Sequence, residues 1–131
     1  MNITIKTESE LDLMRQAGKI LADTLKLIEQ NIYVGQTSEA LNKLAYDYII
    51  SKGAKPSFLG YEGFPYTICA SVNSEVVHGF ATDIPLKDGD IISIDCGVNF
   101  KGYHADAART FPVGNVDNKI LKLIEIGVRS G

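Results

Sequence analysis

Several residue types are scarce in this chain of 131 residues, and each shortage excludes a class of protein. Tryptophan is absent, and the two cysteines, Cys69 and Cys96, fit a reducing compartment better than a disulfide scaffold. No apolar run approaches the roughly 18 residues that a membrane span needs. The N-terminus is polar and charged, unlike the apolar centre of a secretion signal. We therefore expect a cytoplasmic protein that makes no membrane contact.

Positive charge is also limited. The 13 Lys and Arg residues are outnumbered by 16 Asp and Glu residues, and the formal net charge is −3. Because no cluster of basic residues forms a patch, binding to nucleic acid is not expected. The hydrophobic content of 45% and the charged content of 22% are ordinary for a globular protein. A chain of this length predicts a single domain over residues 1–131.

Two amphipathic helices are predicted in the first part of the chain. Apolar residues recur at spacings of three and four over residues 8–31 and again over residues 38–52. Thr7 or Ser9 can cap the start of the first helix, and Gly53 ends the second. The apolar stripes expected to pack on a sheet are Leu11, Met14, Gly18, Leu21, Leu25 and Ile28, followed by Leu41, Leu44, Ala45, Tyr48 and Ile49.

A β-hairpin is predicted in the last third of the chain. Residues 91–100 and 103–113 have strand character, and Lys101-Gly102 between them is typical of a two-residue turn. Such a turn pairs Phe100 with Tyr103, and this pairing determines which residues lie opposite each other along both strands. A slip of one residue would move every side chain of one strand to the other face.

Two aspartates meet on one face of this hairpin. Counting from the turn puts Asp106 opposite Gly97, and Asp95 shares a face with Gly97 because side chains alternate along a strand. As diagonal neighbours, Asp95 and Asp106 have Cβ atoms about 7–8 Å apart, within reach of a shared metal ion. Arg109 could offset one negative charge, but the same alternation points it away from Asp106.

The aspartate pair has two interpretations. Acidic side chains are usually exposed, so the pair could simply be solvated on a surface hairpin. However, the first strand of the hairpin is largely apolar, which indicates that neither of its faces is freely solvated. Two carboxylates on one buried face repel each other, and a divalent cation is the simplest remedy. A metal site is therefore the favoured interpretation.

Five stretches of the sequence, in order, resemble type I methionine aminopeptidases. They are 3–7 (ITIKT), 14–18 (MRQAG), 71–79 (SVNSEVVHG), 86–97 (LKDGDIISIDCG) and 102–106 (GYHAD). The resemblance extends over most of the chain, and the short N-terminal part is similar to the bacterial form of the family.

The resemblance implies an α+β fold that is one half of the pita-bread architecture. Its elements would be a curved antiparallel sheet, two packed helices and a C-terminal helix. The implied activity is removal of the N-terminal methionine from nascent polypeptides. The reaction would depend on two divalent metal ions, for which cobalt, manganese, iron and zinc are the candidates. Asp95 and Asp106 match the first two of five protein ligands. The other three, a histidine and two glutamates, belong to a second half that this chain lacks.

The two histidines of the chain have different expected roles. A structural hydrogen-bonding role is one interpretation of His78, in Val76-Val77-His78-Gly79. The resemblance instead makes His78 a catalytic residue that contacts the substrate near the scissile bond and stabilises the tetrahedral intermediate. His104 lies two residues before Asp106 on the same face, so we expect it to orient a carboxylate rather than to bind the metal.

An aromatic loop is predicted over residues 54–65, where Gly60, Gly63 and Pro65 permit tight bends. A loop that caps the core is one interpretation of this segment. The resemblance assigns it, together with the strand at Cys69, to the pocket for the methionine side chain, because aromatic rings and a thiol suit a thioether. Cys96 points to the opposite face from Asp95 and is expected to be a small core residue. The expected substrate contacts are Phe58, Tyr61, Phe64, Cys69 and His78.

The chain by itself is expected to be inactive. Three of the five expected ligands are missing, and two carboxylates alone should bind a transition metal weakly or not at all. An incomplete fold should also expose a sheet edge and apolar surface, which favours self-association or association with a missing C-terminal half. Two alternatives remain open: a non-catalytic module that binds peptide N-termini, and an inert truncated fragment.

Overall fold

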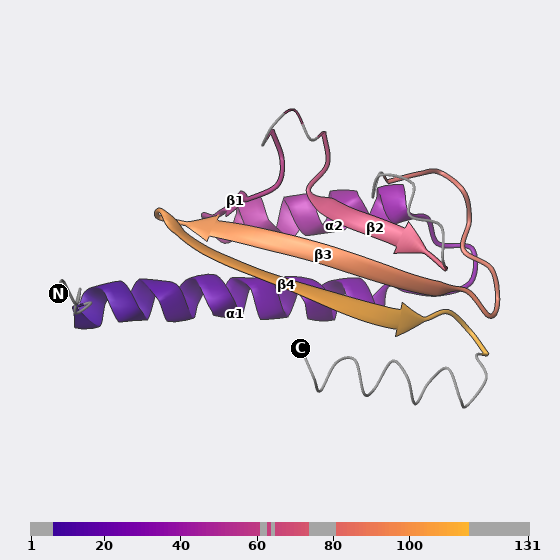
Figure 1. The fold of residues 1–131 in the computed structure, drawn as a ribbon, viewed down its shortest axis with the longest axis horizontal. Coiled ribbons are helices and arrows are strands. Elements are labelled where there is room, and N and C mark those ends of the chain that lie inside the picture. Colours follow the sequence, from indigo (N-terminus) through magenta and orange to yellow (C-terminus); the bar gives the residue numbers. More distant parts are fainter. Residues whose placement is uncertain (1–6, 61–62, 64, 74–80, 116–131) are drawn as a thin grey trace, which may run out of the picture.

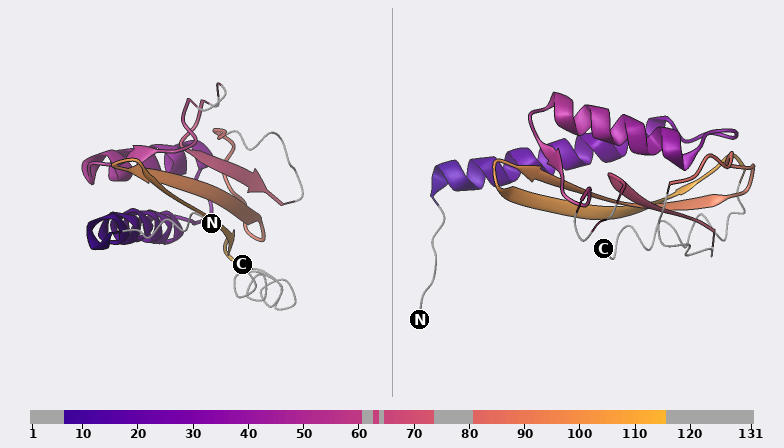
Figure 2. Two further views of the ribbon diagram at one scale, coloured as in Figure 1. Left: turned by 60° about the vertical axis from the view of Figure 1, so that its left-hand side comes forward. Right: turned by 90° about the horizontal axis from the view of Figure 1, so that it is seen from above.

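The computed structural model describes residues 7–60, 63, 65–73 and 81–115. In chain order, the elements are α1 (Glu8–Gln30), α2 (Ser38–Ser51), β1 (Lys55–Pro56), β2 (Ile68–Val72), β3 (Ile91–Phe100) and β4 (Tyr103–Pro112) (Figure 1). Both helices cover the same face of a twisted, curved antiparallel sheet (Figure 2). The predicted sheet with two packed helices is therefore confirmed, whereas the predicted C-terminal helix lies outside the described residues.

Strand β3 is the centre of the sheet. Strand β4 pairs along one side of β3, while β1 and β2 pair with successive stretches of its other side. The turn between β3 and β4 is Lys101-Gly102, as predicted, with φ values of 51° and 90°. Positive φ at both positions matches the turn to the twist of the strands that it joins. Phe100 therefore pairs with Tyr103, and the predicted register is confirmed along the hairpin.

The first helix begins at a complete capping box. The Thr7 side chain accepts a hydrogen bond from the Glu10 backbone N–H at 3.2 Å, and the Glu10 carboxylate accepts one from the Thr7 N–H at 3.3 Å. These bonds satisfy backbone donors that have no partner within a helix. Helix α2 starts in a similar way, with the Thr37 side chain accepting from the Ala40 N–H at 3.1 Å. Neither of these described helices has the length and apolar character needed to cross a membrane.

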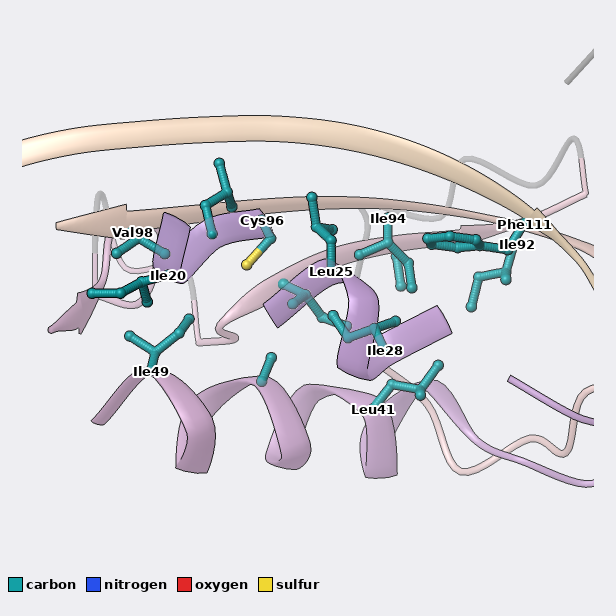
Figure 3. Packing of buried hydrophobic residues seen from close by; sticks show 14 of the residues in the cluster. Ile20, Leu25, Ile28, Leu41, Ile49, Ile92, Ile94, Cys96, Val98 and Phe111 are labelled. Carbon is teal, nitrogen blue, oxygen red and sulfur yellow. The ribbon is translucent and has the colours of Figure 1, made fainter. Parts of the chain in front are cut away.

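The hydrophobic core lies between the two helices and the sheet (Figure 3). Alternate residues of β3, namely Ile92, Ile94, Cys96 and Val98, are fully buried against the helices. Burying one large aliphatic side chain contributes about 1.5–3 kcal/mol, so this strand anchors the fold. Cys96 is a core residue, as predicted, and burial raises the pKa of its thiol to about 12.

Two details of the sequence-based prediction are wrong. The helical periodicity predicts that Leu11 and Met14 pack on the sheet, but each is 39% exposed. The first turns of α1 extend past the hairpin end of the sheet, so its fully buried stripe starts only at Ala17 (Figure 1). The predicted loop over residues 54–65 also contains a strand, because the two residues of β1 pair with the end of β3.

Candidate functional site

The described site residues lie on the face of the sheet that points away from the helices, which we call the open face. Side chains of β3 alternate between the core and this face, and cross-strand pairing extends each open-face residue into a row. The rows are Cys69–Asp95–Ala108, Ser57–Gly97–Asp106 and Lys55–Asn99–His104. Residues from four separate segments of the chain are thus brought together.

The two aspartates are diagonal neighbours on the open face, as predicted. Asp106 on β4 pairs with Gly97, which lies two residues from Asp95 on β3. The pKa of Asp95 is raised, first by partial burial and second by the negative charge of Asp106. Arg109 lies on the helix face of β4 and leaves this repulsion in place. A bound cation would relieve the repulsion, because opposite charge favours the ionised form of both carboxyl groups.

The expectation that the aspartates lie on a buried face is wrong for this chain. Asp95 and Asp106 are both exposed. The apolar character of β3 indicates burial, but its fully buried side chains, those of Ile92, Ile94, Cys96 and Val98, all lie on the helix face. The two described helices cover only that face, so water reaches the carboxylates and screens part of their charge.

The donor set on the open face fits part of a metal site. Carboxylate oxygens such as those of Asp95 and Asp106 suit divalent cations. Within the described ranges, however, no group of three His, Cys, Asp or Glu side chains is arranged to hold a metal ion. Because zinc sites take at least three protein ligands, the described residues supply only part of such a site.

A hydrogen bond connects His104 on β4 to the segment that follows β1. Ser57 Oγ lies 3.1 Å from His104 Nδ1. The Ser57 backbone N–H donates to the Gly97 carbonyl at 3.0 Å, which holds this segment against β3. His104 shares the open face with Asp106, in agreement with the predicted alternation. Its predicted role in orienting a carboxylate remains a prediction.

Gly97 leaves room for this contact and for an aromatic ring. A Cβ atom at Gly97 would lie 3.0 Å from Ser57 Cβ and 3.0 Å from Phe58 Cε1. The half-buried Phe58 ring therefore lies over Gly97 on the open face, in the row that contains Asp106. Ser57 and Gly97 are site residues that no motif in the sequence indicates. The one feature of the sequence that could have indicated Gly97 is the strand alternation, which puts it on the same face as Asp95.

Cys69 lies opposite Asp95 on the open face. The pKa of its thiol is raised, first by burial and second by the charge of Asp95, so the thiol is protonated at neutral pH. Asn42 of α2 holds the start of this strand, because its side-chain oxygen accepts from the N–H groups of Thr67 at 2.7 Å and Ile68 at 3.1 Å. The other predicted site residues, Tyr61, Phe64 and His78, lie outside the described residues.

Similarity to known sequences is extensive. The family model of metallopeptidase family M24 matches residues 12–130. The chain is 52% identical to a methionine aminopeptidase of Clostridium perfringens over 124 residues, which cover 95% of this chain and 50% of the relative. It is 48% identical to methionine aminopeptidase 1 of Bacillus subtilis over 124 residues, which again cover 95% of this chain and 50% of the relative. The chain thus spans about half the length of these relatives.

Solved structures give the same result. The crystal structure of methionine aminopeptidase from Rickettsia prowazekii superposes with a TM-score of 0.87 at 42% identity, over 95% of this chain and 50% of that chain. The methionine aminopeptidase from Thermotoga maritima superposes with a TM-score of 0.86 at 38% identity and the same coverage. The fold of the chain therefore corresponds to half of each of these structures.

Proposed function

The chain belongs to metallopeptidase family M24, and we propose that it is the aspartate-bearing half of an enzyme that removes the N-terminal methionine from nascent polypeptides. The diagonal placement of Asp95 and Asp106 on the open face carries this proposal. The names of the relatives, of which the chain covers half, support methionine as the residue removed. The two unpaired cysteines agree with a cytoplasmic setting.

Asp95 and Asp106 would hold divalent ions, with cobalt, manganese, iron and zinc as the candidates. Such ions, when bound, lower the pKa of a water molecule and polarise a peptide carbonyl. The two carboxylates would fix the position of the ions through oxygen donors on adjacent strands. The free α-amine of the substrate would bind at the same place, which limits cleavage to the first peptide bond.

The methionine side chain would bind between aromatic rings beside the aspartates. Phe58 supports this assignment, because its ring lies over Gly97, the cross-strand partner of Asp106. Cys69 supports it as well, because it lies opposite Asp95 and offers a neutral, polarizable thiol. By resemblance, Tyr61 and Phe64 would complete the pocket and His78 would donate a hydrogen bond to the scissile carbonyl.

In isolation, this chain is proposed to be inactive and to bind metal weakly. Two carboxylates leave most of a coordination sphere unfilled. The missing histidine and glutamates would come from a C-terminal half, either on the same polypeptide or supplied separately. Self-association is a second way to cover the open face. A second copy, however, would supply only aspartates at the metal site, where a histidine and two glutamates are needed.

Hydrolysis of a Met-Ala peptide tests the proposal. The chain is assayed with cobalt or manganese, alone and with the C-terminal half of the Clostridium perfringens relative supplied in trans. Activity only in the mixture, lost in Asp95→Asn and Asp106→Asn, would support the proposal. Activity of the chain alone would contradict the incomplete site, and inactivity in both arms with a folded mixture would contradict the enzymatic role.

A module that binds peptide N-termini without cleaving them is the second candidate. The observation that favours it is the absence of a three-residue metal cluster within the described ranges. A pure binder would keep its affinity for a Met-Ala peptide after Asp95→Asn and Asp106→Asn. A metal-dependent half-site would lose metal-linked affinity in both variants, whereas an inert fragment would bind no peptide in any form.

A further inference from the structure

Ser57 and His104 meet across an intervening strand. Ser57 lies beside Gly97 on one side of β3, and His104 lies on β4 on the other side. Neighbouring strands are about 4.8 Å apart, so these two backbones are separated by roughly twice that distance. Their side chains nevertheless come within 3.1 Å of each other, between Ser57 Oγ and His104 Nδ1.

Gly97 makes this contact possible. Any larger residue there would project a Cβ atom on the open face, 3.0 Å from Ser57 Cβ. Real Cβ contacts are rarely so short, so Ser57 and the equally close Phe58 ring would have to shift by a few tenths of an ångström. Gly97 therefore leaves the space in which the Ser57 hydroxyl group on one side of β3 reaches the His104 imidazole on the other side.

The contact occupies one defined nitrogen of the imidazole ring. Nδ1 is bonded to Ser57, and within the described part of the chain no hydrogen bond to Nε2 is found. A hydrogen bond at one ring nitrogen fixes the orientation of the ring, and a hydroxyl group at Nδ1 selects the tautomer with the proton on Nε2 when the hydroxyl is the donor. Since His104 is exposed, its ring would otherwise be free to rotate among several rotamers.

We infer that Ser57 is a positioning residue that donates its hydroxyl proton to His104 Nδ1 through the gap at Gly97. The proton of the neutral ring then resides on Nε2, which is presented as a hydrogen-bond donor on the open face beside Asp106. An oriented donor beside a carboxylate stabilises that carboxylate as a metal ligand. This last step rests on the proposed function, whereas the orientation of the ring does not.

Nitrogen-15 NMR of the histidine rings tests the inference on the chain as it exists. The chain has two histidines, so His104→Gln assigns the spectrum. At about pH 9, where an ordinary imidazole is neutral, His104 is expected as a single tautomer with the proton on Nε2. Ser57→Ala should give a mixture of tautomers, and Ser57→Thr, which keeps the hydroxyl, should restore the single form. A proton on Nδ1, or a spectrum unchanged in Ser57→Ala, would overturn the inference.

Ser93→Ala is the matched control. It removes another hydroxyl contact of 3.1 Å on the same face, between Ser93 Oγ and Thr110 Oγ1. The His104 spectrum should not change, and a mixture of tautomers in this variant too would overturn a specific role for Ser57. Gly97→Ala provides a second route, because its methyl group would press on Ser57 and on the Phe58 ring, and the spectrum should move towards that of Ser57→Ala.

Metal affinity tests the link to Asp106 separately. In the mixture with a C-terminal half, Ser57→Ala is expected to weaken Mn²⁺ binding by about tenfold, at the lower end of the effect of losing a group that supports a ligand. Ser57→Thr should recover most of this affinity. Unchanged Mn²⁺ affinity would overturn the role towards Asp106. Failure of the proposed function would appear differently, as a lack of peptide hydrolysis by the unmodified mixture.

Discussion

The Tyr103 hydroxyl donates a hydrogen bond of 3.0 Å to Glu10 Oε2, joining two residues that lie 93 positions apart. Tyr103 is the first residue of β4, and Glu10 belongs to the capping box of α1. One carboxylate thus caps the helix and attaches it to the hairpin turn. Because β4 carries His104 and Asp106, this contact links the helix to the strand that holds the candidate site.

The Tyr103 contact predicts a pH dependence of stability. Burial, followed by the hydrogen bond and the charge of Glu10, raises the pKa of Tyr103 above its ordinary value of 10.0. A raised pKa in the folded state means that the contribution is fully present below pH 10 and is lost as the pH rises through the higher folded value. Urea unfolding should show a stability difference between the wild type and Tyr103→Phe at pH 8 that shrinks above pH 10. The control is Tyr33→Phe, which removes the hydroxyl group of an exposed tyrosine that takes no part in this contact.

Removing one aspartate should change the titration of the other. In Asp106→Asn the pKa of Asp95 should fall towards its ordinary value of 3.8, although burial keeps it somewhat raised. The present repulsion disfavours the folded state as the pH rises through the Asp95 pKa, so the variant should gain stability at neutral pH. We expect less than about 1 kcal/mol, because water screens exposed charges. Carbon-13 NMR of the carboxyl groups measures the shift, with the exposed Asp47→Asn as control.

Cys96→Ser should destabilise the chain although it changes only one atom. The Cys96 side chain is fully buried among apolar neighbours, where a hydroxyl group would lack the partners that it has in water. The expected loss is about 1–3 kcal/mol in the free energy of unfolding. Urea denaturation checks this value, and a Cys96→Ser protein as stable as the wild type would contradict the assignment. Thiol labelling of the native chain should modify Cys69 before Cys96.

Asn42→Ala should loosen the strand that carries Cys69. The substitution leaves the Thr67 and Ile68 N–H groups without their acceptor, and an unsatisfied buried donor costs about 1–3 kcal/mol. Hydrogen exchange at these two amides should accelerate, while exchange in the β3–β4 hairpin should change little. Asn42→Asp keeps a side-chain oxygen at the same place and should retain most of the protection. Equal protection in Asn42→Ala would show that the strand does not depend on this side chain.

The register of the β3–β4 hairpin follows from local rules, and it could be predicted from the sequence. The turn at Lys101-Gly102 fixes the pairing, and alternation then places Asp95 and Asp106 on one face. The helix start at Thr7 is local for the same reason, because its capping partners lie within three residues. The roles of Tyr61, Phe64 and His78 remain predictions from resemblance.

Contacts between distant segments could not be predicted in this way. The exposure of Leu11 and Met14 depends on where the sheet ends relative to α1, which no periodicity within the helix encodes. The position of Phe58 over Gly97 depends on the pairing of β1 with β3, far along the chain. The exposure of Asp95 and Asp106 on the open face likewise depends on which side of the sheet the helices cover.

The sequence by itself determined which residues share a strand face, because alternation and turn geometry are properties of neighbouring residues. Asp95, Gly97 and Asp106 are brought together by those rules alone. Only the tertiary structure decided what surrounds them. The hydroxyl of Ser57 reaches His104 because a separate segment docks against β3 where a glycine leaves a gap. Such a contact depends on the packing of the whole sheet, and its partners lie 47 positions apart.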